Sequence, residues 1–285
     1  MVNKMKWYKL KIMKKLFLET TDWNVAWKKN NESSYNVVQN PRGYWLADSL
    51  IFSCKEGIFL FVEAYDKKEK IGKLAVLKYN GEIFSDFRII MEKSYHLSYP
   101  YVFEYNNEYF MIPETSQNNC IEIYKSVNFP YEWVKIKELM EGEYVDTTVF
   151  RYNDEIILYS YDMSNHKLLT GILDMNSLEI NNVSFKIDSE YKLRAGGNVF
   201  EQNDLYCRAV QDNKYFYGQK LNIINCFNNN VIDELKPIDI LNDKNITFKR
   251  LHTYSKSGEY EAIDLSSYKF NLFKIIKKMK GVIKK

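Results

Sequence analysis

The sequence has few cysteines, and their spacing gives no sign of a metal or disulfide site. Only four occur in 285 residues, and no two are close together: Cys54, Cys120, Cys207 and Cys226. A structural zinc site or a disulfide framework needs cysteines at close, regular spacing. We therefore expect reduced thiols, most of them buried in apolar strands, and we predict neither a metal nor an organic cofactor.

The sequence also lacks the signals of membrane insertion, secretion and nucleotide binding. No segment approaches the roughly 18 apolar residues of a membrane-spanning helix. Lysines interrupt the apolar residues of 1–17 too often for a signal peptide. The pair Gly196–Gly197 lacks the further residues of a dinucleotide- or phosphate-binding loop. These absences predict a cytoplasmic protein.

Acidic residues are missing from both ends of the chain. Residues 1–17 contain six lysines and residues 269–285 contain seven, and neither segment has an aspartate or a glutamate. Removing these thirteen charges from the net charge of +3 leaves −10 for residues 18–268. A body of that charge repels phosphate, so nucleic acid is excluded as a general partner.

The segment 269–285 differs from the body and is expected to form a short amphipathic helix. Its apolar residues recur at the spacing of one helical stripe, at Leu272, Ile276, Met279 and Ile283. Such a helix can lie on an anionic membrane, with about 1 kcal/mol gained per lysine near the surface. We therefore expect a peripheral protein at the inner face of the membrane. A solvated terminal helix is the alternative.

A repeat organises residues 1–268. Four segments share an apolar run that ends in phenylalanine, a polar turn and a second apolar run. Their phenylalanines, spaced 51, 47 and 50 residues apart, are Phe52, Phe103, Phe150 and Phe200. A fifth, weaker copy begins at Leu251. A period of this length, with several short strands in each unit, is typical of β-propellers.

The repeat predicts an all-β fold, a five-bladed β-propeller with about four strands per blade. The aromatic content of 16% favours strands, and the polar turns inside the units are hairpin signals. The segment 22–27 is expected to supply the strand that closes the ring. An irregular β-sandwich is the competing fold.

The repeat also predicts where polar residues meet. In a blade, the first strand lines the central channel and the second runs back antiparallel, so the start of one and the end of the other emerge on the same face. One mouth of the channel is therefore expected to gather polar residues from all five blades. The residues at these positions, or next to them, are Asp48, Glu63, His96, Tyr99, Glu114, Asp146, Arg194, Arg208, Gln211, Asp212, Arg250, His252 and Asp264.

Four carboxylates of this mouth are the candidate catalytic groups: Asp48, Glu63, Glu114 and Asp146. Carboxylates around one cleft raise one another's pKa, so that some hold a proton while others stay ionised. That division suits acid–base chemistry on a glycosidic or sugar-phosphate bond. Structural roles are the alternative, because Asp48 and Asp146 can cap strand amides and Glu63 can pair with an arginine.

Other residues of the mouth are candidate substrate-binding groups. Arginine binds phosphate or carboxylate bidentately, and tyrosine offers a flat face to a sugar ring. We assign substrate binding to His96, Tyr99, Arg194, Arg208, Gln211, Asp212 and His252. For His252, a packing or hydrogen-bonding role is the alternative.

Several short sequence motifs at these positions match those of one family, in the same order along the chain. They include WLADSLIF (45–52), HLSYPYVFE (96–104), VDTTVF (145–150), AGGNVF (195–200) and RAVQD (208–212). From residue 45 to residue 264 the sequence resembles the five-bladed propeller domain at the N-terminus of plant glucosamine inositolphosphorylceramide transferases and their bacterial relatives. That family is in turn similar to the arabinanase, xylosidase and fructosidase propellers.

The resemblance implies roles for individual residues. In the wider hydrolase superfamily, an Asp on the first blade is the base or nucleophile and an Asp on a later blade tunes the acid; the matching positions are Asp48 and Asp146. The acid is usually a Glu on a more distant blade, where this sequence has Gly196–Gly197. Glu114, or else Glu63, would take that role.

Together, the resemblance and the basic tail predict a glycosyltransferase-like enzyme at the membrane. It is expected to combine a sugar or nucleotide-sugar substrate with a glycan or lipid-linked glycan acceptor in surface polysaccharide or glycolipid assembly. A furanosidase-type glycoside hydrolase, with Asp48 as base and Glu114 as acid, is one alternative. A non-catalytic sugar-binding propeller is the other.

Overall fold

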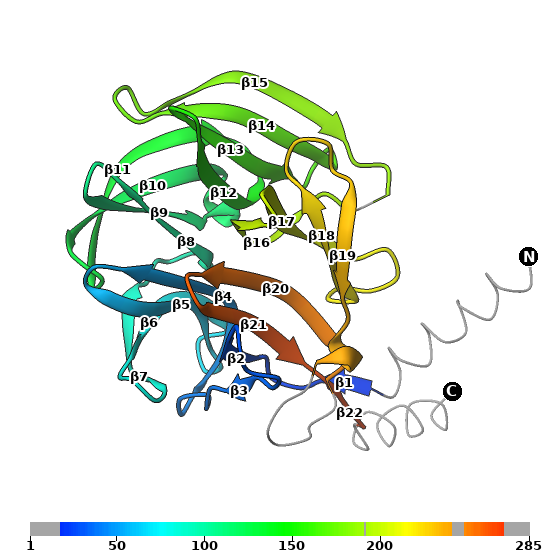
Figure 1. Ribbon diagram of the computed structural model, residues 1–285. Coiled ribbons are helices and arrows are strands. Elements are labelled where there is room, and N and C mark those ends of the chain that lie inside the picture. Colours follow the sequence, from blue (N-terminus) through cyan, green and yellow to red (C-terminus); the bar gives the residue numbers. More distant parts are fainter. Residues whose placement is uncertain (1–17, 191, 241–247, 271–285) are drawn as a thin grey trace, which may run out of the picture.

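Five four-stranded antiparallel sheets are arranged around one axis and form a five-bladed β-propeller (Figure 1). The computed structural model describes residues 18–190, 192–240 and 248–270. The predicted fold class is confirmed. The amphipathic helix expected in residues 269–285 lies outside the described residues, except for its first two positions. In the described ranges, no helix has the length and apolar composition needed to cross a membrane.

Blades 1 to 4 follow one another along the chain, and the first strands of neighbouring blades contact each other at the axis. Blade 1 consists of β4 (Tyr44–Cys54), β5 (Gly57–Asp66), β6 (Ile71–Tyr79) and β7 (Phe84–Met91). Blade 2 consists of β8 (Ser98–Tyr105), β9 (Glu108–Glu114), β10 (Cys120–Asn128) and β11 (Glu132–Glu141). Blade 3 consists of β12 (Tyr144–Tyr152), β13 (Glu155–Asp162), β14 (Lys167–Asp174) and β15 (Glu179–Ile187). Blade 4 consists of β16 (Ala195–Gln202), β17 (Leu205–Asp212), β18 (Lys220–Asn225) and β19 (Val231–Leu235).

Blade 5 combines strands from the two ends of the chain. Its order is β20 (Arg250–Ser257), β21 (Tyr260–Ser266), β2 (Asn24–Lys29) and β3 (Asn36–Val37). Strand β2 pairs antiparallel with β21, so the expectation that segment 22–27 closes the ring is confirmed. A second antiparallel pairing, between β1 (Leu18–Thr20) and β22 (Tyr268–Phe270), lies beside this closure.

Burial falls from the axis outward within each blade. In blade 3, the inner strands β12 and β13 are mostly buried, whereas β15 is exposed along almost its whole length. The largest apolar core joins blades 1, 2 and 3 through side chains such as Phe61, Met111 and Leu158. This packing fixes the backbone near the axis, and the polar side chains at the ends of the inner strands are held on a rigid frame.

The first strand of every blade contains a β-bulge at the same place. The register with the second strand shifts after Ala47, Ser98, Val145, Ala195 and Leu251. A bulge bends the strand and redirects a side chain. The residues that enter the first three bulges have left-handed backbones, with φ of 48° at Asp48, 45° at Tyr99 and 52° at Asp146.

Such a conformation is rare for residues other than glycine and costs about 1–3 kcal/mol. In blade 4 the bulge contains Gly197, with φ of 138°. A Cβ atom there would lie only 1.7 Å from the carbonyl oxygen of Tyr254, so no larger residue fits without movement of the backbone. The repeat detected in the sequence is thus a repeat of bulges, and it determines which side chains reach the axis.

Candidate active site

The bulges bring polar side chains from all five blades to one end of the propeller axis. The Tyr99 N–H donates to Asp48 Oδ2 (3.2 Å), and the Asp48 N–H donates to Asp264 Oδ2 (2.9 Å). The Gln211 side-chain amide donates to Asp146 Oδ2 (3.0 Å). We call this group the axial cluster; its members are Asp48, Glu63, His96, Glu114, Asp146, Arg194, Gln211, His252 and Asp264.

The imidazole of His252 lies between two carboxylates, and we call these three residues the His252 group. Nε2 is 2.9 Å from Asp48 Oδ1, and Nδ1 is 2.9 Å from Asp264 Oδ2. The Nδ1 contact is an ion pair, and Nδ1 makes no hydrogen bond of good geometry to any described residue. Burial alone would lower the pKa of His252, but Asp264 and Asp48 raise it to about 10. The ring is therefore an imidazolium at neutral pH.

Aromatic side chains cover the His252 group. The ring centroid of His252 lies 4.3 Å from that of Trp23 and 5.0 Å from that of Tyr217. The guanidinium of Arg250 lies over both of these aromatic rings, 4.7 Å from Trp23 and 5.3 Å from Tyr217. As a result, the side chain of His252 is only 5% exposed and that of Asp264 is completely buried. His252 and Asp264 are thus sealed from solvent, while the side chain of Asp48 stays 9% exposed.

A second cation, Arg194, lies between Asp146 and Glu114, and we call these three residues the Arg194 group. Arg194 binds Asp146 through Nε and through Nη2, which is 3.3 Å from Oδ1. Its Nη2 is also 3.7 Å from Glu114 Oε2, and the Ser116 hydroxyl donates to Glu114 Oε1 (3.0 Å). Asp146 is 3% exposed, but Arg194 and Glu114 are 20% and 14% exposed. This group is partly open to a ligand.

The carboxyl groups of the cluster have pKa values that are pushed apart. Burial, with the negative charge of Asp146, raises the pKa of Glu114 to about 8, although Arg194 opposes the shift. Burial raises the pKa of Glu63 to about 7, with Asp48 adding to the effect. Burial would also raise the pKa of Asp264, but His252 and several hydrogen bonds lower it below its usual value. Protonated and ionised carboxyl groups therefore lie side by side near neutral pH.

Glu63 has a neutral histidine as its neighbour rather than an arginine. The Gly72 N–H donates to His96 Nδ1 (3.0 Å), which leaves the imidazole proton on Nε2, 3.2 Å from Glu63 Oε1. Burial opposes a charge on His96 and the carboxylate of Glu63 favours one; the net effect is a raised pKa for His96. The hydrogen bond from the Gly72 N–H, however, requires a lone pair on Nδ1 and so opposes a second proton there. We therefore assign the ring as neutral. A Cβ atom at Gly72 would lie 2.4 Å from the backbone carbonyl oxygen of Leu97 and 2.8 Å from Glu63 Oε1, so a glycine is needed here.

In the described part of the chain, two groups place three potential metal ligands within 4.8 Å of one another. The first is the His252 group, in which both ring nitrogens face carboxylates and the imidazolium itself is the cation. The second is Cys120, Glu122 and Glu138. There, Lys135 Nζ lies 3.4 Å from Glu122 Oε1 and 2.7 Å from Glu138 Oε1, so a lysine occupies the cation position. We assign no metal to either group.

Arg208 and Asp212 lie away from the axial cluster, so the structure does not bring these two predicted substrate-binding residues to it. Side chains alternate along β17, so these two residues lie on the sheet face opposite to Gln211. Arg208 is completely buried, and Nη1 donates to the carbonyl oxygen of Leu193 (3.2 Å). Asp212 Oδ2 lies 3.6 Å from Lys220 Nζ.

Tyr99 is buried beneath the axial cluster and not at its exposed surface, so its role in substrate binding stays a prediction. It is completely buried. Its hydroxyl bonds to the carbonyl oxygen of Gly197 (2.7 Å) and to the hydroxyl of Thr148 (2.7 Å), and it accepts the Gly197 N–H (3.1 Å). Tyr99 therefore ties blades 2, 3 and 4 together beneath the carboxylates.

The structure adds residues that sequence reasoning missed or gave no role. Asp264 was expected at the mouth but had no assigned function, and it now joins His252. Trp23 lies in the ring-closing segment, and only its aromatic character could have drawn attention to it. Tyr217, which is 39% exposed, comes from the turn between β17 and β18 and carries no repeat signal. Gly72 could be found only through the residues that pack against it.

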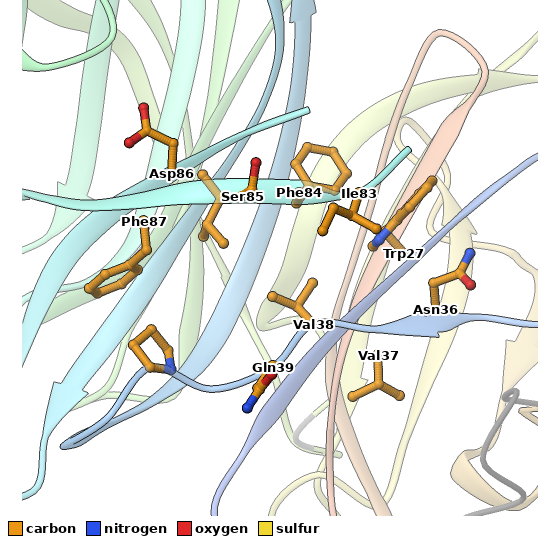
Figure 2. Close-up of a pocket in the computed structure, with 12 residues that line it drawn as sticks. Trp27, Asn36, Val37, Val38, Gln39, Ile83, Phe84, Ser85, Asp86 and Phe87 are labelled. Atoms are coloured by element: carbon orange, nitrogen blue, oxygen red, sulfur yellow. The ribbon is translucent and has the colours of Figure 1, made fainter. Parts of the chain in front are cut away.

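A separate surface groove of about 430 Å³ lies between the outer strands of blades 5 and 1 (Figure 2). Its wall includes Trp27, Val38, Phe84 and Phe87, and it shares no residue with the axial cluster. The groove has few ionisable side chains, with Asp86 as the single acid in its lining. The carboxylates and cations suited to acid–base chemistry therefore lie at the axis and not in this groove.

Comparison with known proteins gives one family and one fold. A family model described as glucosamine inositolphosphorylceramide transferase 1, N-terminal, matches residues 10–250. The chain is 26% identical over 234 residues to glucosamine inositolphosphorylceramide transferase 1 of Oryza sativa subsp. indica, covering 72% of this chain and 31% of the relative. It is 25% identical over 195 residues to the protein of that name in Arabidopsis thaliana, covering 63% and 25%. The chain spans about a third of the length of these relatives, or less.

Among solved structures, the chain is similar to a GH43 β-xylosidase/α-arabinofuranosidase from a compost microbial metagenome. The TM-score is 0.60 at 9% identity, over 82% of this chain and 93% of that one. It is also similar to the catalytic domain of a GH62 α-L-arabinofuranosidase from Coprinopsis cinerea, with a TM-score of 0.59 at 12% identity, over 83% and 85%. At these identities, the likeness shows that the fold is shared.

Proposed function

The chain belongs to the family described as glucosamine inositolphosphorylceramide transferase 1, N-terminal, and from this premise we propose that it is a glycosyltransferase-like, carbohydrate-active enzyme. Its substrates would be a sugar or nucleotide-sugar donor and a glycan or lipid-linked glycan acceptor. The relatives are named glucosamine inositolphosphorylceramide transferases, and this name supports the proposed class of substrate. The reaction would serve surface polysaccharide or glycolipid assembly.

One observation supports catalysis above all: the axial cluster holds carboxyl groups in two protonation states at neutral pH. Glu114 has a pKa raised to about 8 and is partly exposed, so it can donate a proton to a leaving group. Asp48, ion-paired with His252, is the candidate base or nucleophile. Asp146 orients Arg194 and raises the pKa of Glu114. Glu63, with a pKa of about 7, is the second candidate acid.

Phosphate binding in this proposal falls to Arg194. It is the guanidinium of the cluster that is partly exposed, at 20%. Its Nη2 lies 3.7 Å from Glu114, longer than an optimal charge-assisted hydrogen bond, so a phosphate oxygen could compete for that nitrogen. Protonation of Glu114 would weaken the ion pair further and favour the exchange.

The test is donor turnover by Asp48→Asn and Glu114→Gln. Release of nucleoside diphosphate from a panel of nucleotide sugars, and of free sugar from aryl glycosides, would be measured. Removal of the base or acid should lower kcat by about 10²-fold or more while the fold is kept. The matched control is Glu155→Gln, an exposed carboxylate at the start of β13. Unchanged turnover in Asp48→Asn would remove Asp48 from the mechanism.

The same assay separates the two alternatives. Free sugar released from aryl furanosides, without transfer to any acceptor, would favour a furanosidase-type hydrolase; the fold shared with GH43 and GH62 enzymes motivates this candidate. Glycan binding that survives the triple loss of Asp48, Glu114 and Asp146, with no turnover of any donor, would indicate a sugar-binding propeller.

Membrane association through the basic C-terminal segment is part of the proposal. A lipid-linked acceptor would be presented at an anionic surface, which seven lysines in residues 269–285 would attract. Because Phe270 pairs with Leu18, the deletion should begin at residue 271 so that strand β22 is kept. Loss of sedimentation with phosphatidylglycerol liposomes is expected on this deletion, and persistent binding would contradict it.

A further inference from the structure

The His252 group has a geometry that suits a task in catalysis. We propose that His252 and Asp264 are positioning residues: together they form a fixed, charged chain that holds the carboxylate of Asp48 in one orientation for the reaction. The inference rests on the role proposed above for Asp48. It assigns a function to Asp264, which lies 216 positions further along the chain from Asp48.

Asp264 is the fixed end of this chain. The backbone N–H groups of His252 and Thr253 donate to Oδ1, at 3.1 and 2.9 Å. The N–H of Asp48 (2.9 Å) and the Thr253 hydroxyl donate to Oδ2. Four donors on a completely buried carboxylate leave it no freedom to rotate or to accept a proton easily. Asp264 therefore fixes both the place of the imidazole and the start of the Asp48 bulge.

Asp48 is held from both sides as a consequence. Its Oδ1 faces His252 Nε2 at 2.9 Å, and its Oδ2 accepts the N–H of Tyr99 at 3.2 Å. Its own N–H is bound to Asp264, in a left-handed conformation that is kept only under such constraint. Blades 5, 1 and 2 thus each contribute to the site, and together they define a single plane for the carboxylate.

The residues around the His252 group keep its imidazole and carboxylates charged. Asp48 and Asp264 face the two nitrogens of His252, and Glu63 adds a further negative influence. The rings of Trp23 and Tyr217 cover the imidazole, and the charge of Arg250 is directed onto those rings. The electron-rich faces of the rings attract the guanidinium, so this neighbouring cation is held outside the His252 group.

The first experiment tests the charge on His252 by NMR of its ring nitrogens. The protein has three histidines, so His96→Gln and His166→Asn assign the signals. His166 lies in an exposed turn with φ of 51°, a conformation that asparagine also adopts, and its variant is the matched control. Both nitrogens of His252 should carry protons from pH 6 to pH 9. Titration near the ordinary value of 6.5 would overturn the proposal, whether or not the protein has activity.

The second experiment tests the orientation of Asp48. In crystal structures of His252→Gln and Asp264→Asn, the Asp48 carboxylate should leave its present plane, and donor turnover should show kcat reduced about 10- to 100-fold with KM unchanged. A carboxylate that stays in place, or full turnover with both variants, would overturn the positioning role. If the unaltered protein turns over no donor, the proposed function fails. The position of the Asp48 carboxylate in the variants still shows whether His252 and Asp264 hold it in place. Should Asp264→Asn fail to fold, His252→Gln and Thr253→Val supply the same measurement.

Discussion

The His252 group and the Arg194 group have the same composition, one cation between two carboxylates, but they differ in exposure. The side chains of His252 and Asp264 are 5% and 0% exposed, whereas those of Arg194 and Glu114 are 20% and 14% exposed. The first is held by contacts of 2.9 Å on both sides, and the second has one contact at 3.7 Å. The sealed residues His252 and Asp264 cannot exchange partners with a ligand, whereas Asp48, at the edge of the same group with 9% exposure, and the half-open Arg194 group can. The comparison therefore separates His252 and Asp264, which we propose fix the geometry, from Asp48 and the Arg194 group, which we propose meet the substrate.

The largest expected effect is on stability. His252→Ala leaves Asp48 and Asp264 buried without their cation, and the free energy of unfolding at pH 7 should fall by about 3–5 kcal/mol. Arg194→Ala should cost less, about 1–3 kcal/mol, because Asp146 keeps its bond from Gln211 and Glu114, with a pKa of about 8, already carries a proton at this pH. Urea unfolding followed by tryptophan fluorescence measures both.

The control for this comparison is Arg151→Ala. Arg151 pairs with Asp154 at 3.5 Å, but the two side chains are 66% and 100% exposed, so the unfolding midpoint should not move. Equal losses from His252→Ala and Arg194→Ala would show that burial does not distinguish the two groups.

The next effect is the pH dependence of stability, which changes by about 1.4 kcal/mol per pH unit while a group binds more protons in the folded than in the unfolded protein. Glu114 binds its proton more tightly when folded, so its contribution is complete below pH 4.5 and is lost as the pH rises through about 8. The contribution of His252 is complete below pH 6.5 and is lost as the pH rises through about 10. Both contributions make the protein less stable in base.

Two variants show which loss of stability comes from Glu114 and which from His252. Glu114→Gln should flatten the stability curve between pH 4.5 and 8, and His252→Gln should flatten it between pH 6.5 and 10. Urea midpoints at pH 5, 7 and 9 are sufficient. Two variants with parallel curves would mean that the groups do not titrate separately.

The repeat could predict the fold and the positions of the cluster, because both follow from a fixed number of residues per blade. Asp48, Asp146 and His252 occupy equivalent bulges, so their convergence is a property of spacing. The alternation of side chains along a strand could also have been applied to the sequence. Gln211 and Asp212 are neighbours on β17, so only one of them can face the axis.

The partners of each charged group could not be predicted. Which cation meets Asp146, or that Glu63 meets His96, depends on the directions of side chains from different blades. The tautomer of His96 depends on an N–H from Gly72, which belongs to the third strand of blade 1. Such contacts are set by packing distances of a few ångström, and sequence spacing does not contain them.

The smallest effect is the response of each ion pair to salt. In double-mutant cycles at pH 9, where Glu114 is ionised, Arg194→Gln with Glu114→Gln should give a coupling of about 0.5–1 kcal/mol at low salt. At 1 M NaCl the screening length is about 3 Å, so a partly exposed pair at 3.7 Å should lose most of this coupling. The cycle of His252→Gln with Asp264→Asn should be independent of salt, since ions cannot enter a site that Trp23 and Tyr217 cover. If salt weakened both couplings alike, the His252 group would be open to solvent, and the division between a sealed positioning part and an open substrate-facing part would fail.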